Sequence, residues 1–232
     1  MDAALKAVLF DMDGTLYDSM TAHAKAWTEV AAAHQLIASE LDFYLFEGMT
    51  GEDTINKLFL RTHHRFASKD EMRDIYSEKS RLFETCHTGR QPMPGVLGVL
   101  EKAKASGLQL VVVTGSAQKS LIDTLCEDFP GYFDPRKIVT ALDVLRGKPD
   151  PEPYLNGLHK AGVAPSQAIV IENAPLGIRA AVAAGIFTVA VNTGPLDNEV
   201  LLQAGAHRLY PHMKALADDW TALQTYFLHR NS

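Results

Sequence analysis

The 232-residue chain has few cysteines, no excess of basic residues and no long apolar run. Cys86 and Cys126 lack the paired spacing of a metal site, so we interpret them as reduced packing residues. The formal net charge of −6 argues against binding to a nucleic-acid backbone. No apolar segment reaches the roughly 20 residues that cross a bilayer, and residues 1–6 show no signal-peptide pattern. We therefore expect a cytoplasmic monomer without a nucleic-acid or membrane partner.

The composition and the order of the apolar segments predict an α/β protein. With 47% hydrophobic residues, the chain can bury the core of one large domain, or of one domain with an insertion. Strand patterns alternate with helical patterns, which indicates a Rossmann-like, doubly wound parallel sheet with helices on both faces. The expected strands are 7–10, 108–113, 138–140, 168–171 and 188–191, and the expected helices are 20–34, 52–61, 69–86, 94–106, 119–125, 152–160 and 175–184.

One long stretch interrupts the alternation. Between about residues 19 and 84 the pattern is helical throughout, and no strand pattern occurs in it. The sequence therefore predicts one α/β domain made of residues 1–17 and 85–232, with residues 18–84 inserted after the first strand as a small helical domain. An insertion of this length is large enough to form a lid.

Two carboxylates follow the first apolar segment. Residues 7–10 end at Asp11, and Asp13 lies two positions later, a spacing that aims both side chains the same way in extended backbone. Gly14 then permits a sharp exit from the strand. Open α/β sheets hold ligands at the carboxyl ends of their strands, so the pair fits a site for a cation and a phosphoryl group. The same Asp-x-Asp-Gly pattern also occurs in ordinary turns, where Asp and Gly serve backbone hydrogen bonding.

Further polar groups follow later strands. A Thr-Gly-Ser segment offers hydroxyls and open backbone to phosphate oxygens, a loop lysine can neutralise phosphate charge, and a Glu-Asn pair supplies oxygen donors that Mg²⁺ prefers. Each group also has an ordinary alternative, as a helix cap or a solvated loop charge. Their common position at one end of the inferred sheet favours a site. These candidates are Thr114, Gly115, Ser116, Lys148, Glu172 and Asn173.

The ordered set of motifs resembles the haloacid dehalogenase superfamily of phosphotransferases. The D-x-D-G-T motif at 11–15, the hydroxyl motif, the lysine and the acidic motif stand on successive strands, and the likeness covers nearly the whole chain. The helical insertion resembles the small cap domain of the β-phosphoglucomutase-like subgroup, and His23, Trp27 and the segment 177–185 also resemble that subgroup. The resemblance implies that residues 18–84 are a cap domain over a catalytic core.

This resemblance implies roles for the candidate residues. Asp11 would be the nucleophile that forms an aspartyl-phosphate, and Asp13 the acid/base. Mg²⁺ would be held by the Asp11 carboxylate, the Asp13 carbonyl and Asn173, with Glu172 nearby or acting through water. Lys148 would neutralise charge. The hydroxyl motif, with Thr114 foremost, would hold the oxygens of a small phosphorylated substrate.

The cap loop departs from the subgroup's pattern. β-Phosphoglucomutases carry a basic residue just before the cap-loop glycine and an arginine just before its Glu-Asp pair, and these hold the second phosphate of a sugar bisphosphate. Here those positions are Glu47 and Gly51. Mutase chemistry needs that clamp while water is excluded, so we expect hydrolysis rather than transfer between sugar hydroxyls.

A second departure concerns the expected metal site. Asn173 stands where the subgroup has aspartate, while the cap loop has gained Glu47. We hypothesise that cap closure brings Glu47 to the Mg²⁺ or its water shell, where it would repel a bulky anionic leaving group. Inorganic pyrophosphate fits that description, and the chain resembles a branch of the subgroup that hydrolyses it. The alternative is that Glu47 is a solvated loop acid.

Two cap residues and three functions stay open. His23 and Lys79 are candidates for substrate contact, against a packing histidine and a solvated lysine. The functions are an Mg²⁺-dependent pyrophosphatase or small sugar-phosphate phosphatase, a β-phosphoglucomutase, and a non-catalytic binding module. The complete set of Asp11, Asp13, Thr114 and Lys148 disfavours the last.

Overall fold

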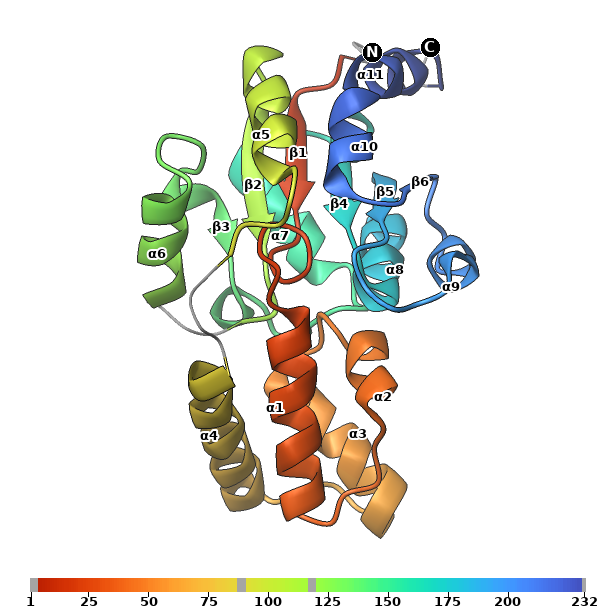
Figure 1. Ribbon diagram of the computed structural model, residues 1–232. Coiled ribbons are helices and arrows are strands. Elements are labelled where there is room, and N and C mark those ends of the chain that lie inside the picture. Colours follow the sequence, from red (N-terminus) through yellow and green to blue (C-terminus); the bar gives the residue numbers. More distant parts are fainter. Residues whose placement is uncertain (1–3, 87–90, 117–119, 231–232) are drawn as a thin grey trace.

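The computed structural model describes residues 4–86, 91–116 and 120–230, with the side chains of residues 120–123 left out. Its centre is a sheet of six parallel strands in the order β3-β2-β1-β4-β5-β6 (Figure 1). This order confirms the predicted Rossmann-like, doubly wound fold. The strands are β1 (Ala7–Phe10), β2 (Gln109–Val113), β3 (Ile138–Val139), β4 (Ala168–Glu172), β5 (Phe187–Val191) and β6 (Arg208–Tyr210).

Both faces of the sheet are covered, which explains why its central strands read as unbroken apolar runs. In β1, Val8 and Phe10 pack into the apolar cluster on one face of the sheet, while Ala7 and Leu9 pack into the cluster on the other face. The helices of the core are α5 (Val96–Ala105), α6 (Ser120–Asp128), α7 (Glu152–Ala161), α8 (Pro175–Ala183), α9 (Asn198–Gln203), α10 (Met213–Asp218) and α11 (Trp220–Arg230).

Helices alone form the inserted segment. α1 (Met20–Ala33), α2 (Glu40–Leu45), α3 (Gly51–His63) and α4 (Lys69–Cys86) pack around an apolar cluster that contains Trp27, Phe43 and Leu58. The cluster continues into the core domain through Ile178 and Leu201. Figure 1 shows this group beyond the carboxyl ends of the strands. We propose, as the sequence predicts, that residues 18–84 act as a cap domain over a core made of 1–17 and 85–232.

The structure adds elements that the sequence did not predict. The strand β6 and the helices α2, α9 and α10 are all short, at three to six residues. The expected helix 119–125 begins outside the described residues and continues as α6 to Asp128. No helix within the described part of the chain is both long and apolar enough to cross a membrane.

Candidate active site

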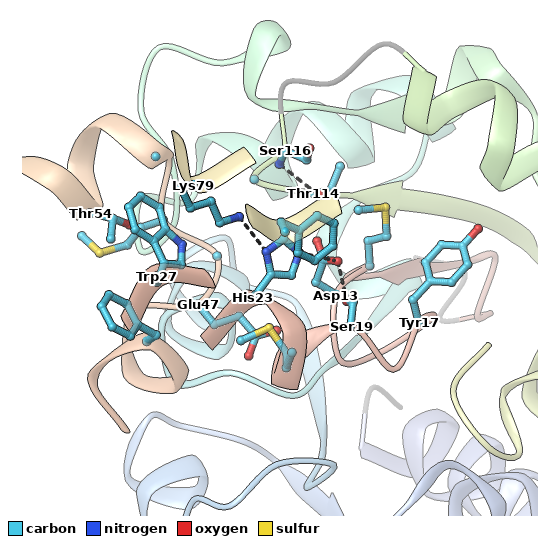
Figure 2. A pocket seen from close by; sticks show the side chains of 18 of the residues that line it. Asp13, Tyr17, Ser19, His23, Trp27, Glu47, Thr54, Lys79, Thr114 and Ser116 are labelled. Atoms are coloured by element: carbon cyan, nitrogen blue, oxygen red, sulfur yellow. Dashed lines mark hydrogen bonds and ion pairs between the residues drawn. The ribbon is translucent and has the colours of Figure 1, made fainter. Parts of the chain in front are cut away.

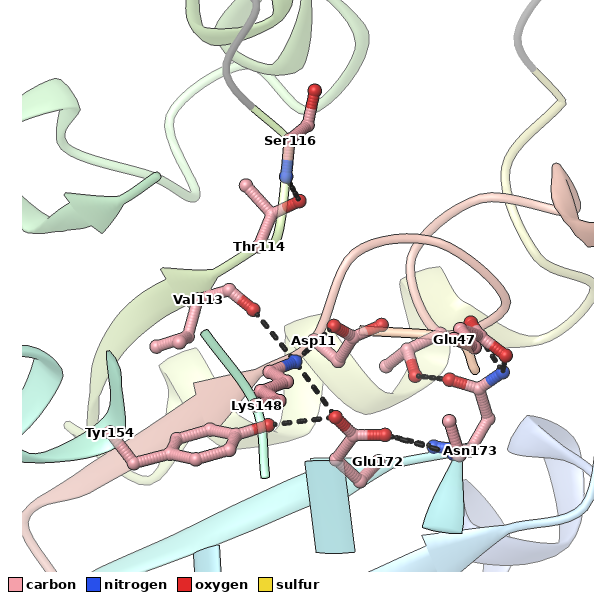
Figure 3. A network of polar contacts seen from close by, with 11 residues as sticks. Asp11, Glu47, Val113, Thr114, Ser116, Lys148, Tyr154, Glu172 and Asn173 are labelled. Atoms are coloured by element: carbon pink, nitrogen blue, oxygen red, sulfur yellow. Dashed lines mark hydrogen bonds and ion pairs between the residues drawn. The ribbon is translucent and has the colours of Figure 1, made fainter. Parts of the chain in front are cut away.

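The predicted site residues meet at the carboxyl ends of three adjacent strands. Asp11 follows β1, Thr114 follows β2 and Glu172 ends β4. Because β1 pairs with β2 on one side and β4 on the other, these three residues share one edge of the sheet. Figure 3 shows Lys148 reaching into the middle of this group from the loop before α7.

Asp11 and Lys148 form the centre of the site. The Lys148 Nζ donates to Asp11 Oδ1 at 2.5 Å, to the Val113 carbonyl at 3.2 Å and to Glu172 Oε1 at 2.8 Å. The other Asp11 oxygen, Oδ2, is buried without a hydrogen-bond partner in the described structure. Burial raises the pKa of Asp11 to about 8, the Lys148 ammonium opposes the rise and Glu172 adds to it. The positive charge of Lys148 therefore does not offset the burial of Asp11 and the nearby carboxylates, so a further cation would find excess negative charge here.

Glu172 is fully engaged by protein donors. Oε1 accepts from Lys148 and from the Tyr154 hydroxyl, the latter at 3.0 Å. Oε2 accepts from the backbone N–H groups of Asn173 and Ala174, both at 2.9 Å. These contacts satisfy the lone pairs of the carboxylate. The structure thus places Glu172 beneath Lys148, where its predicted contact with a metal would compete with these bonds.

Asp13 ends a chain of polar contacts that starts in the cap (Figure 2). Lys79 Nζ lies 2.7 Å from His23 Nδ1, and His23 Nε2 lies 3.2 Å from Asp13 Oδ1. The Ser19 hydroxyl donates to the same Asp13 oxygen at 2.6 Å. Burial raises the pKa of Asp13, but His23 and then Ser19 lower it by more than burial raises it, and the result is a pKa of about 2. The two cap residues whose role the sequence leaves undecided therefore connect to the predicted acid/base, His23 directly and Lys79 through His23.

Lys79 is a buried cation in this chain. It is 7% exposed, and its Nζ lies 5.4 Å from the centre of the Trp27 ring and 5.0 Å from that of Phe83. Burial lowers the pKa of Lys79 to about 8, against the negative charge of Asp13, which raises it. The alternative of a solvated lysine does not agree with this burial.

The hydroxyl motif forms a turn that packs against the cap. The Thr114 Oγ1 accepts from the Ser116 backbone N–H at 3.1 Å. A side chain at Gly115 would stand 2.9 Å from the carbonyl oxygen of Gly48, and one at Gly48 would stand 2.8 Å from Lys148 Cδ. Gly48 also has a φ of +86°, which favours glycine. Close backbone approach thus brings the cap loop onto the core.

Glu47 crosses from the cap loop to the predicted metal site. The Asn173 amide nitrogen donates to both Glu47 oxygens, at 2.9 and 3.0 Å, while the Asn173 Oδ1 accepts from the Thr15 hydroxyl at 3.0 Å. Burial raises the pKa of Glu47 well above its usual value, and the nearby Asp11 and Glu172 raise it further. Glu47 is therefore held at the site by Asn173.

The position of the missing cap arginine is filled by an aromatic ring. A side chain at Gly51 would meet the Tyr76 ring at 2.2 Å. Glu47, Gly51 and Tyr76 line a cavity of about 540 Å³ between cap and core, into which Asp11 and Asp13 also open. Among the described residues that line it, Lys79 is the sole lysine or arginine.

The predicted metal ligands are mixed oxygen donors rather than a preformed cluster of acidic side chains, and they fit a hard divalent cation. Among residues 4–86, 91–116 and 120–230, no group of three or more His, Cys, Asp or Glu is arranged to hold a metal ion. The predicted set uses a backbone carbonyl and an amide besides carboxylates, and such oxygens suit Mg²⁺. The unpartnered Asp11 Oδ2 and the excess of buried carboxylates are compatible with that ion.

Several site residues were missed in the sequence. Three of them contact a predicted residue: Thr15, Ser19 and Tyr154. The fourth, Tyr76, occupies the space that a side chain at position 51 would need. Thr15 belongs to the D-x-D-G-T motif, so its neighbours were a signal. The others reach the site from different elements and have no local pattern that marks them.

Comparisons with known proteins agree with this geometry. The family model described as haloacid dehalogenase-like hydrolase matches residues 8–191. Hexitol phosphatase A of Escherichia coli (strain K12) is 35% identical over 83% of this chain and 85% of its own. Beta-phosphoglucomutase of Bacillus subtilis (strain 168) is 25% identical over 82% and 84%.

A solved structure extends the similarity to the whole fold. The protein described as "Putative beta-phosphoglucomutase from Bacteroides vulgatus" is 47% identical, with a TM-score of 0.93, and the match covers 97% of this chain and 91% of that one. The chain therefore belongs to the haloacid dehalogenase-like hydrolase family, among its phosphatases and beta-phosphoglucomutase-like members.

Proposed function

We propose that the protein hydrolyses a small phosphorylated compound through a phosphoryl group carried on Asp11. The observation that supports this most is the unpartnered Oδ2 of Asp11, which is buried beside Lys148. Attack by this oxygen on phosphorus would form the aspartyl-phosphate and release the leaving group. Covalent catalysis divides one difficult displacement into two easier ones.

Asp13 would transfer the protons of both half-reactions. At neutral pH its carboxylate is ionised, so the proton that it passes to the leaving oxygen would come from His23 and Lys79 behind it. It would then accept the proton of the water that attacks the phosphorus of phospho-Asp11. Ser19 and His23 hold its Oδ1, and Asp13 lines the cavity between cap and core. This arrangement orients the carboxylate while its proton is exchanged.

Positive charge and hydrogen-bond donors would hold the transferred group. Lys148 would neutralise charge next to Asp11, while Thr114, Ser116 and the Gly115 backbone would bind phosphoryl oxygens. Mg²⁺ would be held by Asp11, the Asp13 carbonyl, Asn173 and Glu47. When bound, it would offset the carboxylate charge and orient the phosphoryl group.

Inorganic pyrophosphate is the substrate that we favour. Glu47 places a carboxylate where a bulky anionic leaving group would have to lie, and Asn173 fixes it there. Lys79 supplies one cap cation, which suffices for a small leaving phosphate. The Gly51 position, filled by Tyr76, offers no clamp for the second phosphate of a sugar bisphosphate, which disfavours a mutase.

A small sugar phosphate is the second candidate. The cavity of about 540 Å³ is larger than a pyrophosphate needs, and Trp27, Phe43 and Tyr76 line its cap side. Such aromatic walls suit a carbon-containing leaving group. The hexitol phosphatase relative is compatible with this reading.

Phosphate release in the presence of Mg²⁺ tests these candidates. The panel contains pyrophosphate, glucose 1-phosphate, glucose 6-phosphate, phosphoserine and a nucleoside monophosphate. We expect pyrophosphate to have the highest kcat/KM, whereas dominance of a hexose phosphate would select the second candidate. Isomerisation of glucose 1-phosphate would favour a mutase, and no turnover of any compound would favour a binding module.

A substitution of Glu47 separates the substrates further. Glu47→Ala should lower pyrophosphate hydrolysis about tenfold more than hydrolysis of a small organic phosphate, because one leaving group shares the metal and the other does not. Glu52→Ala, which removes an exposed acid of the same cap segment, is the control. Equal losses for both substrates, or no loss, would remove the pyrophosphate argument.

A further inference from the structure

Tyr154 is a buried residue that contacts the site from behind. It lies on α7 with no exposed surface, and its hydroxyl donates to Glu172 Oε1 at 3.0 Å. The Lys148 Nζ lies 5.1 Å from the centre of its ring. Tyr154 does not line the cavity between cap and core, so it has no direct access to a substrate there. Any effect on the reaction must pass through Glu172 or Lys148.

Two glycines bring the helices close enough for this contact. On α7, a side chain at Gly157 would meet Leu9 Cδ2 at 2.8 Å, so the helix lies directly on β1. On α8, a side chain at Gly177 would meet Glu172 Oε1 at 1.5 Å, so Glu172 lies against the helix backbone. Both helices therefore approach the sheet closely where Tyr154 meets Glu172.

The Tyr154 hydroxyl and Lys148 share a single oxygen. Glu172 Oε1 accepts from both, while the Lys148 ammonium is divided between Glu172, Asp11 and the Val113 carbonyl. A hydrogen bond to Oε1 disperses part of its negative charge. Without that bond, Glu172 would attract the ammonium more strongly, and Lys148 would be drawn away from Asp11.

We propose that Tyr154 is a positioning residue, which acts through Glu172 to keep the Lys148 ammonium on the Asp11 carboxylate (Figure 3). The expected effect on catalysis rests on the proposed function, in which Lys148 neutralises charge while the phosphoryl group is transferred to Asp11. The arrangement of the three side chains is independent of the substrate.

A double-mutant cycle tests the inference in the full chain. Tyr154→Phe keeps the ring and removes the hydroxyl. We expect kcat to fall about tenfold with KM unchanged, as is typical for groups that orient a site from outside it. In a Glu172→Gln background, Tyr154→Phe should have little further effect, since the charge it balances is gone. Tyr44→Phe alters another buried tyrosine, in the cap, and should leave kcat unchanged.

A second readout does not depend on turnover. By NMR, hydrogen exchange of the Lys148 ammonium protons should be several-fold faster in Tyr154→Phe than in the parent, and unchanged in Tyr44→Phe. Equal exchange rates in Tyr154→Phe and the parent would overturn the inference. So would an unchanged kcat in an active protein, or full additivity with Glu172→Gln. A parent protein that turns over no phosphorylated compound would overturn the proposed function instead, and the exchange rates would then decide the inference alone.

Discussion

At the scale of single residues, Lys79 has the environment most unlike that expected of its type. A surface lysine keeps its charge far above neutral pH, but burial between Trp27 and Phe83 brings the pKa of Lys79 to about 8. Below that pH the ammonium can donate to His23 and, in the proposed function, would attract a leaving phosphate. Above it the amine becomes neutral, and that attraction is lost.

This environment predicts the alkaline side of the pH profile. The kcat/KM for pyrophosphate should fall as pH rises through about 8, because free enzyme with a neutral Lys79 binds the anion poorly. In Lys79→Arg the fall should move to higher pH, since a guanidinium stays charged. The measurement is kcat/KM between pH 6 and 10 for both proteins. A fall at the same pH in Lys79→Arg would assign it to another group.

A place at the carboxyl edge of the sheet could be predicted from the sequence for the residues that directly follow a strand. An apolar strand ends directly before each of Asp11, Thr114 and Asn173, so these residues lie at the edge of the sheet. Lys148 lies in a loop that approaches the same edge. Tyr154 belongs to an ordinary amphipathic helix. Its role depends on how closely two helices approach the sheet, and this distance has no signature in a single sequence.

At the scale of elements, the packing of α8 against β4 holds the site together. Gly177 lies where the Glu172 carboxylate needs space, and a methyl group there would meet Oε1 at 1.5 Å. Displacing Glu172 would also disturb the bonds that it accepts from Lys148 and Tyr154. The glycine therefore matters for packing rather than for backbone freedom.

Replacement of this glycine should be costly. We expect Gly177→Ala to lower the free energy of unfolding by about 1–3 kcal/mol through overpacking, and to reduce kcat through displacement of Lys148. The matched control is Gly98→Ala in α5, where the added methyl would meet Ala217 Cβ at an acceptable 3.4 Å. Alanine is the better helix former, so the control should be neutral or stabilising. Urea denaturation measures both, and equal stabilities would refute the packing argument.

The elements that could not be predicted are short and near the surface. β6 has three residues, of which Arg208 is exposed, and it pairs with β5 alone at one edge of the sheet. Too few residues are present there to show a period, and tertiary pairing decides the structure. α2 does carry a capping box at Ser39 and Asp42, which was an available signal.

At the scale of the whole molecule, one loop of the cap reaches across to the core at the site. Gly48 lies against Lys148 and Gly115, and Glu47 accepts two hydrogen bonds from Asn173. The insertion of a helical segment after the first strand could be predicted, because strand and helix patterns stop alternating there. Its position over the strand ends was expected from the family resemblance, whereas the Glu47 contact was a hypothesis from a single loop residue.

This contact predicts how Mg²⁺ changes stability. At about 100 times its dissociation constant, Mg²⁺ should stabilise the protein by about 2.7 kcal/mol, and raise the Tm by about 5–10 °C at this chain length. In Glu47→Gln the shift should be clearly smaller, because one of the carboxylates offered to the ion is gone, while Glu52→Gln should match the parent. Calorimetry in EDTA and in Mg²⁺ measures the shifts. The same shift in Glu47→Gln would show that Glu47 does not take part.

The central claim is that Asp11 carries the phosphoryl group during turnover. Its most direct test is acid quenching of a single turnover of pyrophosphate, followed by mass spectrometry of the peptide that contains Asp11. We predict that this peptide gains one phosphoryl group, that Asp13→Asn prolongs its lifetime, and that Asp11→Asn is inactive. Release of phosphate with no phosphorylated peptide at any time, or an Asp11→Asn protein as active as the parent, would contradict the account.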